Sequence, residues 1–73
     1  MTTDAVVEID ARGMRCPWPA LRLARAMRSA DRVCLRADDP AAAAELAALA
    51  AAQGWSIAEQ ASVGGARQWQ VGR

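Results

Sequence analysis

Cys16 is the residue of this chain best suited to chemistry, because it directly precedes Pro17 at the expected start of a helix. Pro17 fits the first helical position, which predicts that Cys16 is the N-cap. A helix start carries roughly half a positive charge, and thiols there can have pKa values lowered from about 8.5 to roughly 3.5–7.5. Pro17 and Pro19 lack an N–H group, so we expect the amides of Trp18 and Ala20 to be the donors nearest the sulfur. The pattern predicts a nucleophilic thiolate.

The rest of the chain offers this thiol little assistance. Histidine is absent, which excludes a Cys-His hydrolase mechanism and argues against a zinc site of ordinary ligand spacing. The second cysteine, Cys34, falls between Val33 and Leu35, where we expect ordinary strand packing and no resolving role. A cysteine with neither base nor resolving partner suits a carrier, which takes a group from one protein and hands it to another. We expect no cofactor and no metal.

Positive charge is concentrated around Cys16, although the net charge is only +1. All nine basic residues are Arg, and the part of the chain between residues 12 and 36 contains one acid, Asp31, and seven of them: Arg12, Arg15, Arg22, Arg25, Arg28, Arg32 and Arg36. We expect Arg12 and Arg15 to add positive charge near a thiolate or persulfide. Arg22 and Arg25 form part of a helix ridge that is either a solvated face or a partner-binding surface.

Other residues near Cys16 have supporting interpretations. Asp10 is placed to brace the following loop by accepting backbone N–H bonds, and Gly13 lies inside that loop. Trp18 follows the helix start too closely to point easily into the core. It is therefore either an exposed aromatic for partner docking or a local packing residue.

Short periodic segments predict the elements that position these residues. Residues 5–9 and 33–37 alternate as strands do, and residues 17–30 place Leu21, Leu23 and Met27 at helical spacing. Asp39-Pro40 indicates the start of a second helix, with Asp39 as its N-cap, and Gly54 is placed to end that helix after Gln53.

The last part of the chain predicts a hairpin around Gly64-Gly65, with strands over residues 55–61 and 66–71. A two-residue turn would put Trp69 and Val71 on the face opposite Trp55 and Ile57. We therefore predict a three-residue connection, Val63-Gly64-Gly65, which pairs Ile57 with Val71 and brings all four apolar residues to one face.

The expected fold is a two-layer α/β (α+β) sandwich of order βαβαββ, with a mixed four-stranded sheet and two helices on one face. At 73 residues the chain fits a single domain, residues 1–73. No apolar run reaches about 20 residues, and from the polar, acidic start of the sequence we expect no signal peptide. We expect a cytoplasmic protein that does not bind membranes, with both cysteines kept as thiols.

The segment from Asp10 to Pro19, Asp-Ala-Arg-Gly-Met-Arg-Cys-Pro-Trp-Pro, resembles the signature of the TusA-like (SirA/YedF) sulfur carriers, and Asp38-Asp39-Pro40 matches a second feature of that family. The similarity covers nearly the whole chain. It implies that Cys16 carries a persulfide received from a cysteine desulfurase or rhodanese-like donor. The acceptor would serve tRNA thiolation, molybdenum cofactor synthesis or sulfur oxidation. Trp18 stands where members of the tRNA pathway tend to have an acidic residue.

These considerations assign Cys16 as the catalytic residue. The supporting set is Asp10, Arg12, Gly13, Arg15, Pro17 and Pro19, and the partner-binding set is Trp18, Arg22 and Arg25. The expected partners are a sulfur-donor and a sulfur-acceptor protein, bound by a monomer that makes no direct contact with nucleic acid. The alternative is a regulatory or nucleic-acid-binding module that uses the Arg-rich patch. A thiol redox protein is a weaker alternative, because no Cys-x-x-Cys pair is present.

Overall fold

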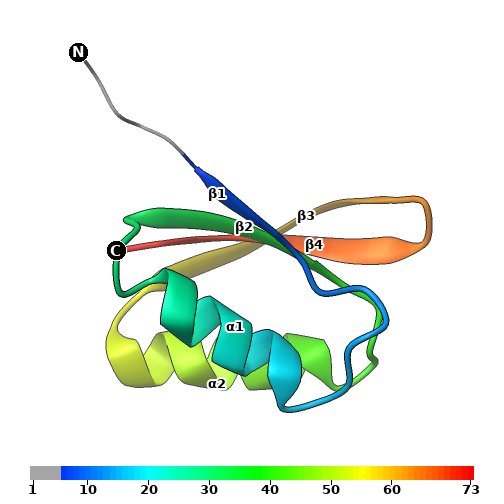
Figure 1. Ribbon diagram of the computed structural model, residues 1–73, viewed down its shortest axis with the longest axis horizontal. Coiled ribbons are helices and arrows are strands. Elements are labelled where there is room, and N and C mark those ends of the chain that lie inside the picture. Colours follow the sequence, from blue (N-terminus) through cyan, green and yellow to red (C-terminus); the bar gives the residue numbers. More distant parts are fainter. Residues whose placement is uncertain (1–5) are drawn as a thin grey trace.

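The computed structural model describes residues 6–73 and arranges six elements in the predicted order (Figure 1). The elements are β1 (Val7–Asp10), α1 (Trp18–Ala26), β2 (Arg32–Ala37), α2 (Ala42–Gln53), β3 (Ser56–Val63) and β4 (Ala66–Gly72). Ala5, where we predicted the first strand to begin, lies outside the described residues.

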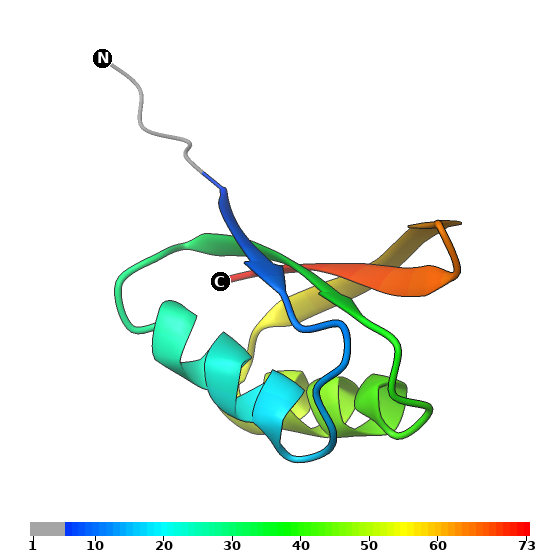
Figure 2. The same ribbon diagram turned by 45° about the vertical axis from the view of Figure 1, so that its right-hand side comes forward.

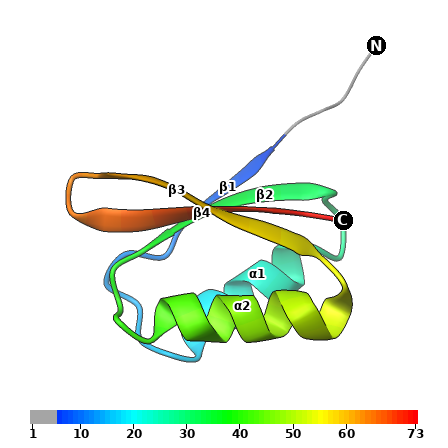
Figure 3. The same ribbon diagram turned by 180° about the vertical axis from the view of Figure 1, so that it is seen from behind.

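The strands form one mixed sheet of four strands in the order β1-β2-β4-β3. β1 pairs with β2 in parallel, and β4 pairs antiparallel with both β2 and β3. Both helices cover the same face of this sheet and begin at the same end of it (Figures 1 and 3). The predicted two-layer α+β fold is confirmed, and it leaves the second face of the sheet open.

The core lies between the sheet and the two helices. Alternate residues of β2, namely Val33, Leu35 and Ala37, are fully buried there, as period-two alternation requires. α1 contributes Leu23, and α2 contributes Leu46. Full burial of a leucine side chain stabilises a fold by about 1.5–3 kcal/mol, so these residues hold the helix layer on the sheet.

The first helix differs from the prediction in length and in one inward residue. α1 ends at Ala26 instead of Ala30, because the chain tightens there: the N–H of Ser29 donates to the Ala26 carbonyl, three residues back. Leu23 and Met27 point inward as predicted, but Leu21 is 51% exposed. Leu23 and Met27 are four residues apart and so define the buried face of this short helix, and Leu21 lies outside that face.

The second helix starts later than predicted and ends where predicted. Ala41 occupies the N-cap position of α2 and provides no side-chain cap, so Asp39 is not the N-cap. The Asp39 carboxylate instead accepts a hydrogen bond from the Ala41 N–H at 3.1 Å, in the turn before the helix. Gly54 ends α2 in a left-handed conformation.

The hairpin has the predicted register but a shorter turn. Ile57 pairs with Val71, and Trp69 is buried while Trp55 packs half-buried against the core, so the predicted apolar face is confirmed. The turn itself is Gly64-Gly65, both with positive φ, and an irregularity between Gln60 and Val63 absorbs the extra residue. The turn end of the hairpin extends past the helices (Figure 2).

Candidate functional site

Cys16 is an exposed, free cysteine in the irregular segment between β1 and α1. It is not the N-cap that the sequence predicted, because Pro17 occupies the N-cap position and α1 begins at Trp18. The Trp18 amide donates to the Arg15 carbonyl at 2.9 Å, so it is engaged by the backbone and not by the sulfur. The thiol therefore lies one residue farther from the helix start than expected.

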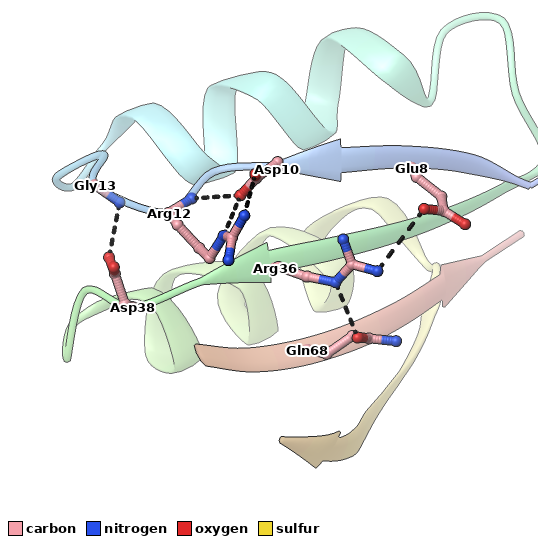
Figure 4. Close-up of polar contacts among 7 residues, drawn as sticks. All are labelled: Glu8, Asp10, Arg12, Gly13, Arg36, Asp38 and Gln68. Atoms are coloured by element: carbon pink, nitrogen blue, oxygen red, sulfur yellow. Dashed lines mark hydrogen bonds and ion pairs between the residues drawn. The ribbon is translucent and has the colours of Figure 1, made fainter. Parts of the chain in front are cut away.

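Two carboxylates from the connection between β2 and α2 hold the segment that carries Cys16. Asp39 Oδ2 accepts a hydrogen bond from the Cys16 backbone N–H at 2.6 Å. Asp38 Oδ1 accepts one from the Gly13 N–H at 2.9 Å (Figure 4). Gly13 has a φ of +82°, a conformation that favours glycine. The pKa of Asp39 is lowered by the hydrogen bond from the Cys16 amide, which is the largest cause, and by a second one from the Ala41 amide.

Asp10 and Arg12 form a second brace in the same segment (Figure 4). The Asp10 carboxylate accepts hydrogen bonds from the Arg12 backbone N–H at 3.2 Å and from its guanidinium at 2.8 and 2.7 Å. The guanidinium bonds are the main cause that lowers the pKa of Asp10 to about 2. Asp10 thus accepts a backbone N–H bond from the following loop, whereas the charge of Arg12, expected near the sulfur, is paired with Asp10 instead.

The electrostatic environment of the Cys16 thiol is the reverse of the prediction. The Glu45 carboxylate is the largest cause that raises the pKa of the Cys16 thiol, and partial removal of water and the negative charge of Asp39 raise it further. Carboxylates disfavour a second negative charge nearby, so they outweigh the helix-start effect at this position. The surroundings of Cys16 therefore favour the protonated thiol over the thiolate.

The surface next to Cys16 is apolar and basic. Trp18 is 59% exposed, and Leu21 lies one turn farther along α1 with comparable exposure. The local-packing alternative for Trp18 is thereby disfavoured. Arg22 and Arg25 are exposed on the same helix, and neither takes part in an ion pair within residues 6–73.

A groove beside this surface separates the Cys16 segment from the start of α2. Gly13, Met14 and Arg15 line one side, and Asp38, Asp39 and Pro40 line the other. Arg15 is exposed there and contributes to the lowered pKa of Asp39. The groove is thus lined by residues that precede Cys16 and by the two carboxylates that hold its segment.

Cys34 is separated from Cys16 by the sheet. It lies in β2 between two core residues, so its side chain points to the open face, where it is half-buried and pairs in register with Glu8 and Gln70. Its neighbour along that face, Arg36, contacts Glu8 and Gln68 (Figure 4). The structure does not bring the two cysteines together.

Sequence reasoning missed the roles of Asp39 and Glu45 at the thiol. Asp39 was interpreted as a helix cap, and nothing in the sequence around Glu45 indicates proximity to Cys16. Asp39 and Glu45 are both distant from Cys16 in sequence, and their influence on it depends on how the start of α2 packs beside the Cys16 segment. The acidic pair Asp38-Asp39 before Pro40 is the one local signal from which the contact could have been suspected.

Residues 6–73 contain neither a membrane-spanning helix nor a cluster of metal ligands. No helix there is long and apolar enough to cross a membrane. No group of three or more His, Cys, Asp or Glu side chains in this part of the chain is placed to hold a metal ion.

Comparisons with known proteins place the chain in a family. The family model described as Sulfurtransferase TusA matches residues 7–71. The crystal structure of a SirA-like protein from Desulfitobacterium hafniense superposes with a TM-score of 0.83 at 21% identity, covering 93% of this chain and 96% of that one, which shows a shared fold. No curated protein matches the chain significantly. The match over nearly all of the described residues shows that the chain belongs to the TusA sulfurtransferase family.

Proposed function

We propose that this protein is a sulfur carrier that holds a transferable sulfur atom on Cys16. In the loading step, the Cys16 sulfur forms a bond to the outer sulfur of a persulfide on a donor protein. The sulfur–sulfur bond of the donor breaks, and the donor cysteine leaves with the electron pair and takes up the proton that Cys16 loses. The resulting Cys16 persulfide then gives its outer sulfur to an acceptor by the same exchange.

The exposure of Cys16 on a segment fixed by backbone hydrogen bonds is the observation that carries this proposal. A carrier thiol must be reachable by the reactive cysteines of two different proteins, and an exposed thiol meets that need. The bond from the Cys16 N–H to Asp39 fixes the backbone and leaves the side chain free. Membership in the TusA sulfurtransferase family supports the same role.

The supporting residues act by shaping this segment. Asp10 and Arg12 brace its beginning, and the left-handed conformation of Gly13 turns the chain toward Asp38. Pro17 and the buried Pro19 fix the backbone at the start of α1. Arg15 is the supporting residue whose charge remains available to a bound persulfide or to a partner.

Trp18, Arg22 and Arg25 form the proposed docking surface, together with Leu21. An exposed aromatic lies beside the thiol, next to two arginines of α1 that form no ion pair within residues 6–73, and this suits a partner with an apolar contact point and acidic surroundings. We propose a cysteine desulfurase or rhodanese-like donor, and an acceptor in tRNA thiolation, molybdenum cofactor synthesis or sulfur oxidation. Capture of partners on the persulfidated protein distinguishes these pathways.

We further propose that the chain works as one carrier domain, as a monomer and in the cytoplasm. A monomer keeps Cys16 open to both partners, and a reducing compartment keeps Cys16 and Cys34 as thiols between transfers.

Mass spectrometry of the intact protein tests the carrier role. After incubation with a cysteine desulfurase and cysteine, the wild-type chain should gain the mass of one sulfur atom, and the Cys16→Ser variant should gain none. Cys34→Ser is the matched control and should load like the wild type. Equal loading of the Cys16→Ser variant, or none of the wild type, would contradict the proposal.

The alternative of nucleic-acid binding has less support. Binding of single strands on a sheet face relies on exposed aromatic residues, but Trp69 is buried and Trp55 packs against the core. On the open face, the Arg36 guanidinium is engaged by Gln68 and Glu8. Salt-dependent RNA binding that survives Cys16→Ser would favour this alternative.

A further inference from the structure

The segment that carries Cys16 continues the pairing of β1 with β2 beyond the end of β1. The N–H of Ala11, the first residue after β1, donates to the Arg36 carbonyl of β2 at 2.8 Å. Two residues later, the N–H of Gly13 donates to Asp38 Oδ1 at 2.9 Å (Figure 4). Gly13 and Asp38 are 25 residues apart, as are Ala11 and Arg36, so the second bond keeps the register of the parallel strands. The Asp38 carboxylate therefore takes the place that a backbone carbonyl would have in a longer ladder.

A side chain replaces the backbone here because strand geometry ends on both sides of the pair. β2 ends at Ala37, and Gly13 has a φ of +82°, which lies outside the range of a strand. No atom lies within 4 Å of the place that a Cβ of Gly13 would occupy. The turn at Gly13 is thus not forced by crowding, and its bond to Asp38 is the contact that holds it.

The Asp38 carboxylate has no other recorded use. The residue is exposed, and within residues 6–73 its side chain takes part in no ion pair and in no second hydrogen bond. The pKa of the Cys16 thiol is raised by Glu45, by partial removal of water and by Asp39, and Asp38 is not among these causes. What Asp38 contributes to the site is therefore geometric.

We propose that Asp38 is a positioning residue for sulfur transfer, which places Cys16 by fixing the turn at Gly13. Gly13 precedes Cys16 by three residues, and Asp39 holds the Cys16 amide itself. With both bonds the chain that leads to the thiol is fixed at two points, whereas with the Asp39 bond alone it can pivot about Cys16. This inference rests on the proposed carrier function and adds Asp38 to the supporting residues predicted from the sequence.

Sulfur exchange with a docked protein depends on direction. The Cys16 sulfur has to approach the outer sulfur of the donor persulfide along the sulfur–sulfur bond that breaks, and a docked donor presents that bond in one orientation. A small reagent in solution can instead meet an exposed thiol from many directions. A positioning residue should therefore matter for transfer between proteins and not for reaction with a small molecule.

Two variants of Asp38 separate the position of the acceptor from its charge. Asp38→Asn keeps an acceptor oxygen at the same place and removes the charge, whereas Asp38→Glu keeps the charge and moves the acceptor by one methylene. The maximal rate of sulfur loading from a persulfidated desulfurase should stay within about 3-fold of the wild type in Asp38→Asn and fall roughly 10-fold in Asp38→Glu. The donor concentration that gives half of this rate should not change, because Asp38 lies outside the proposed docking surface on α1.

Alkylation by iodoacetamide provides a readout that separates positioning from an effect on the thiol itself. Cys16 should be alkylated at the wild-type rate in both variants, because the reagent needs no docked orientation. Asp31→Asn is the control, since Asp31 is an exposed carboxylate that pairs with Arg73, and it should alter neither loading nor alkylation.

Three results would overturn the role of Asp38. Loading by Asp38→Glu as fast as by Asp38→Asn would show that position is not what Asp38 supplies, and alkylation that slows in parallel with loading would place the effect on the thiol. If circular dichroism shows that either variant is unfolded, hydrogen exchange of the wild type decides: the exposed Gly13 amide should be protected, and free exchange would contradict the bond. Failure of the wild type to load sulfur would instead overturn the carrier function, on which this inference rests.

Discussion

Cys16 lies in an irregular segment beside α1, where it is exposed and carboxylates lie near its thiol. Cys34, by contrast, lies within β2, where it is half-buried on the open face of the sheet. In β2 the backbone is fixed by strand pairing, and the neighbouring strands enclose the side chain. In the Cys16 segment, by contrast, the backbone is fixed by side-chain carboxylates and the thiol projects beyond it. The comparison shows how the same residue type becomes a reachable group at one position and a packing residue at the other.

The largest effect is expected from removing the carboxylate that fixes Cys16. Asp39→Ala deletes the hydrogen bonds to the Cys16 and Ala41 amides, so the thiol should lose its defined position. Misplacement of a reacting atom by about 1 Å can cost roughly 100-fold in rate, and we expect sulfur loading to fall by 10- to 100-fold on this scale. Rapid-quench measurement of the Cys16 persulfide gives the rate.

Asp31→Ala is the matched control for this change. Asp31 is almost fully exposed and pairs with Arg73, away from Cys16. Loading by this variant should equal that of the wild type. If Asp39→Ala also loads sulfur at the wild-type rate, the hydrogen bond to Asp39 is not what makes Cys16, rather than Cys34, the residue that loads.

A smaller effect is expected from the exposed aromatic residue. Trp18→Ala should weaken binding of the sulfur donor by about 1–2 kcal/mol, or roughly 5- to 30-fold in Kd, because an exposed tryptophan beside the site is a typical binding hot spot. Stability should change by less than about 0.5 kcal/mol, since the side chain contributes little to the core. Calorimetric titration with the donor measures the first quantity, and urea unfolding measures the second.

Val7→Ala provides the comparison for Trp18, because Val7 is also exposed, at 41%, but lies at the far end of β1. It should bind the donor normally. A large loss of stability in Trp18→Ala, with unchanged affinity for the donor, would show that Trp18 is a packing residue and not a docking residue.

Reversing charge on α1 should act mainly on association. Arg25→Glu should lower the association rate with the donor several-fold at low salt, and the difference should shrink as salt screens the charges. Stopped-flow association at two ionic strengths provides the measurement. Arg32→Glu at the start of β2 is the control, and an equal slowing by both variants would show that net charge matters more than the α1 surface.

The smallest expected effect is a loss of stability at acidic pH, caused by protonation of Asp10. The pKa of Asp10 is about 2 in the folded protein and about 3.9 for an unperturbed Asp, so its bonds to Arg12 stabilise the fold fully above pH 4. That contribution is lost as the pH falls from 4 through 2. The Arg12 amide resonance should therefore titrate near pH 2 in NMR spectra, and Arg12→Ala should move the Asp10 titration upward. An Asp10 titration near 4 in the wild type would contradict the brace.

Much of the fold could be predicted from the sequence because its signals are local. Alternation in β2 and the apolar residues of the hairpin determined the register, and Ile57 pairs with Val71 as predicted. The predicted length of the turn was wrong, because an irregularity in β3 absorbs the residue that was predicted to belong to the turn. The register of the strands depends on which face is buried, and the apolar pattern reports that face. The length of the turn also depends on whether a strand contains a bulge, which the apolar pattern does not report.

The site was less predictable because its main contacts are long-range. The position of Cys16 before a proline predicted a helix cap and a lowered pKa, but the helix begins later and carboxylates raise the pKa instead. Asp39 and Glu45 approach the thiol only through the packing of α2 beside α1. Local rules identified the reactive residue, and its electrostatic surroundings required the tertiary structure.

Quantification of persulfide on the two cysteines of one molecule tests the carrier role most directly. Wild-type protein incubated with a persulfidated donor is trapped by alkylation and digested, and the peptides that contain Cys16 and Cys34 are measured by mass spectrometry. Cys16 should hold nearly all of the transferred sulfur, while Cys34 stays a thiol. Equal labelling of both cysteines, or sulfur found mainly on Cys34, would contradict the assignment of Cys16 as the carrier group.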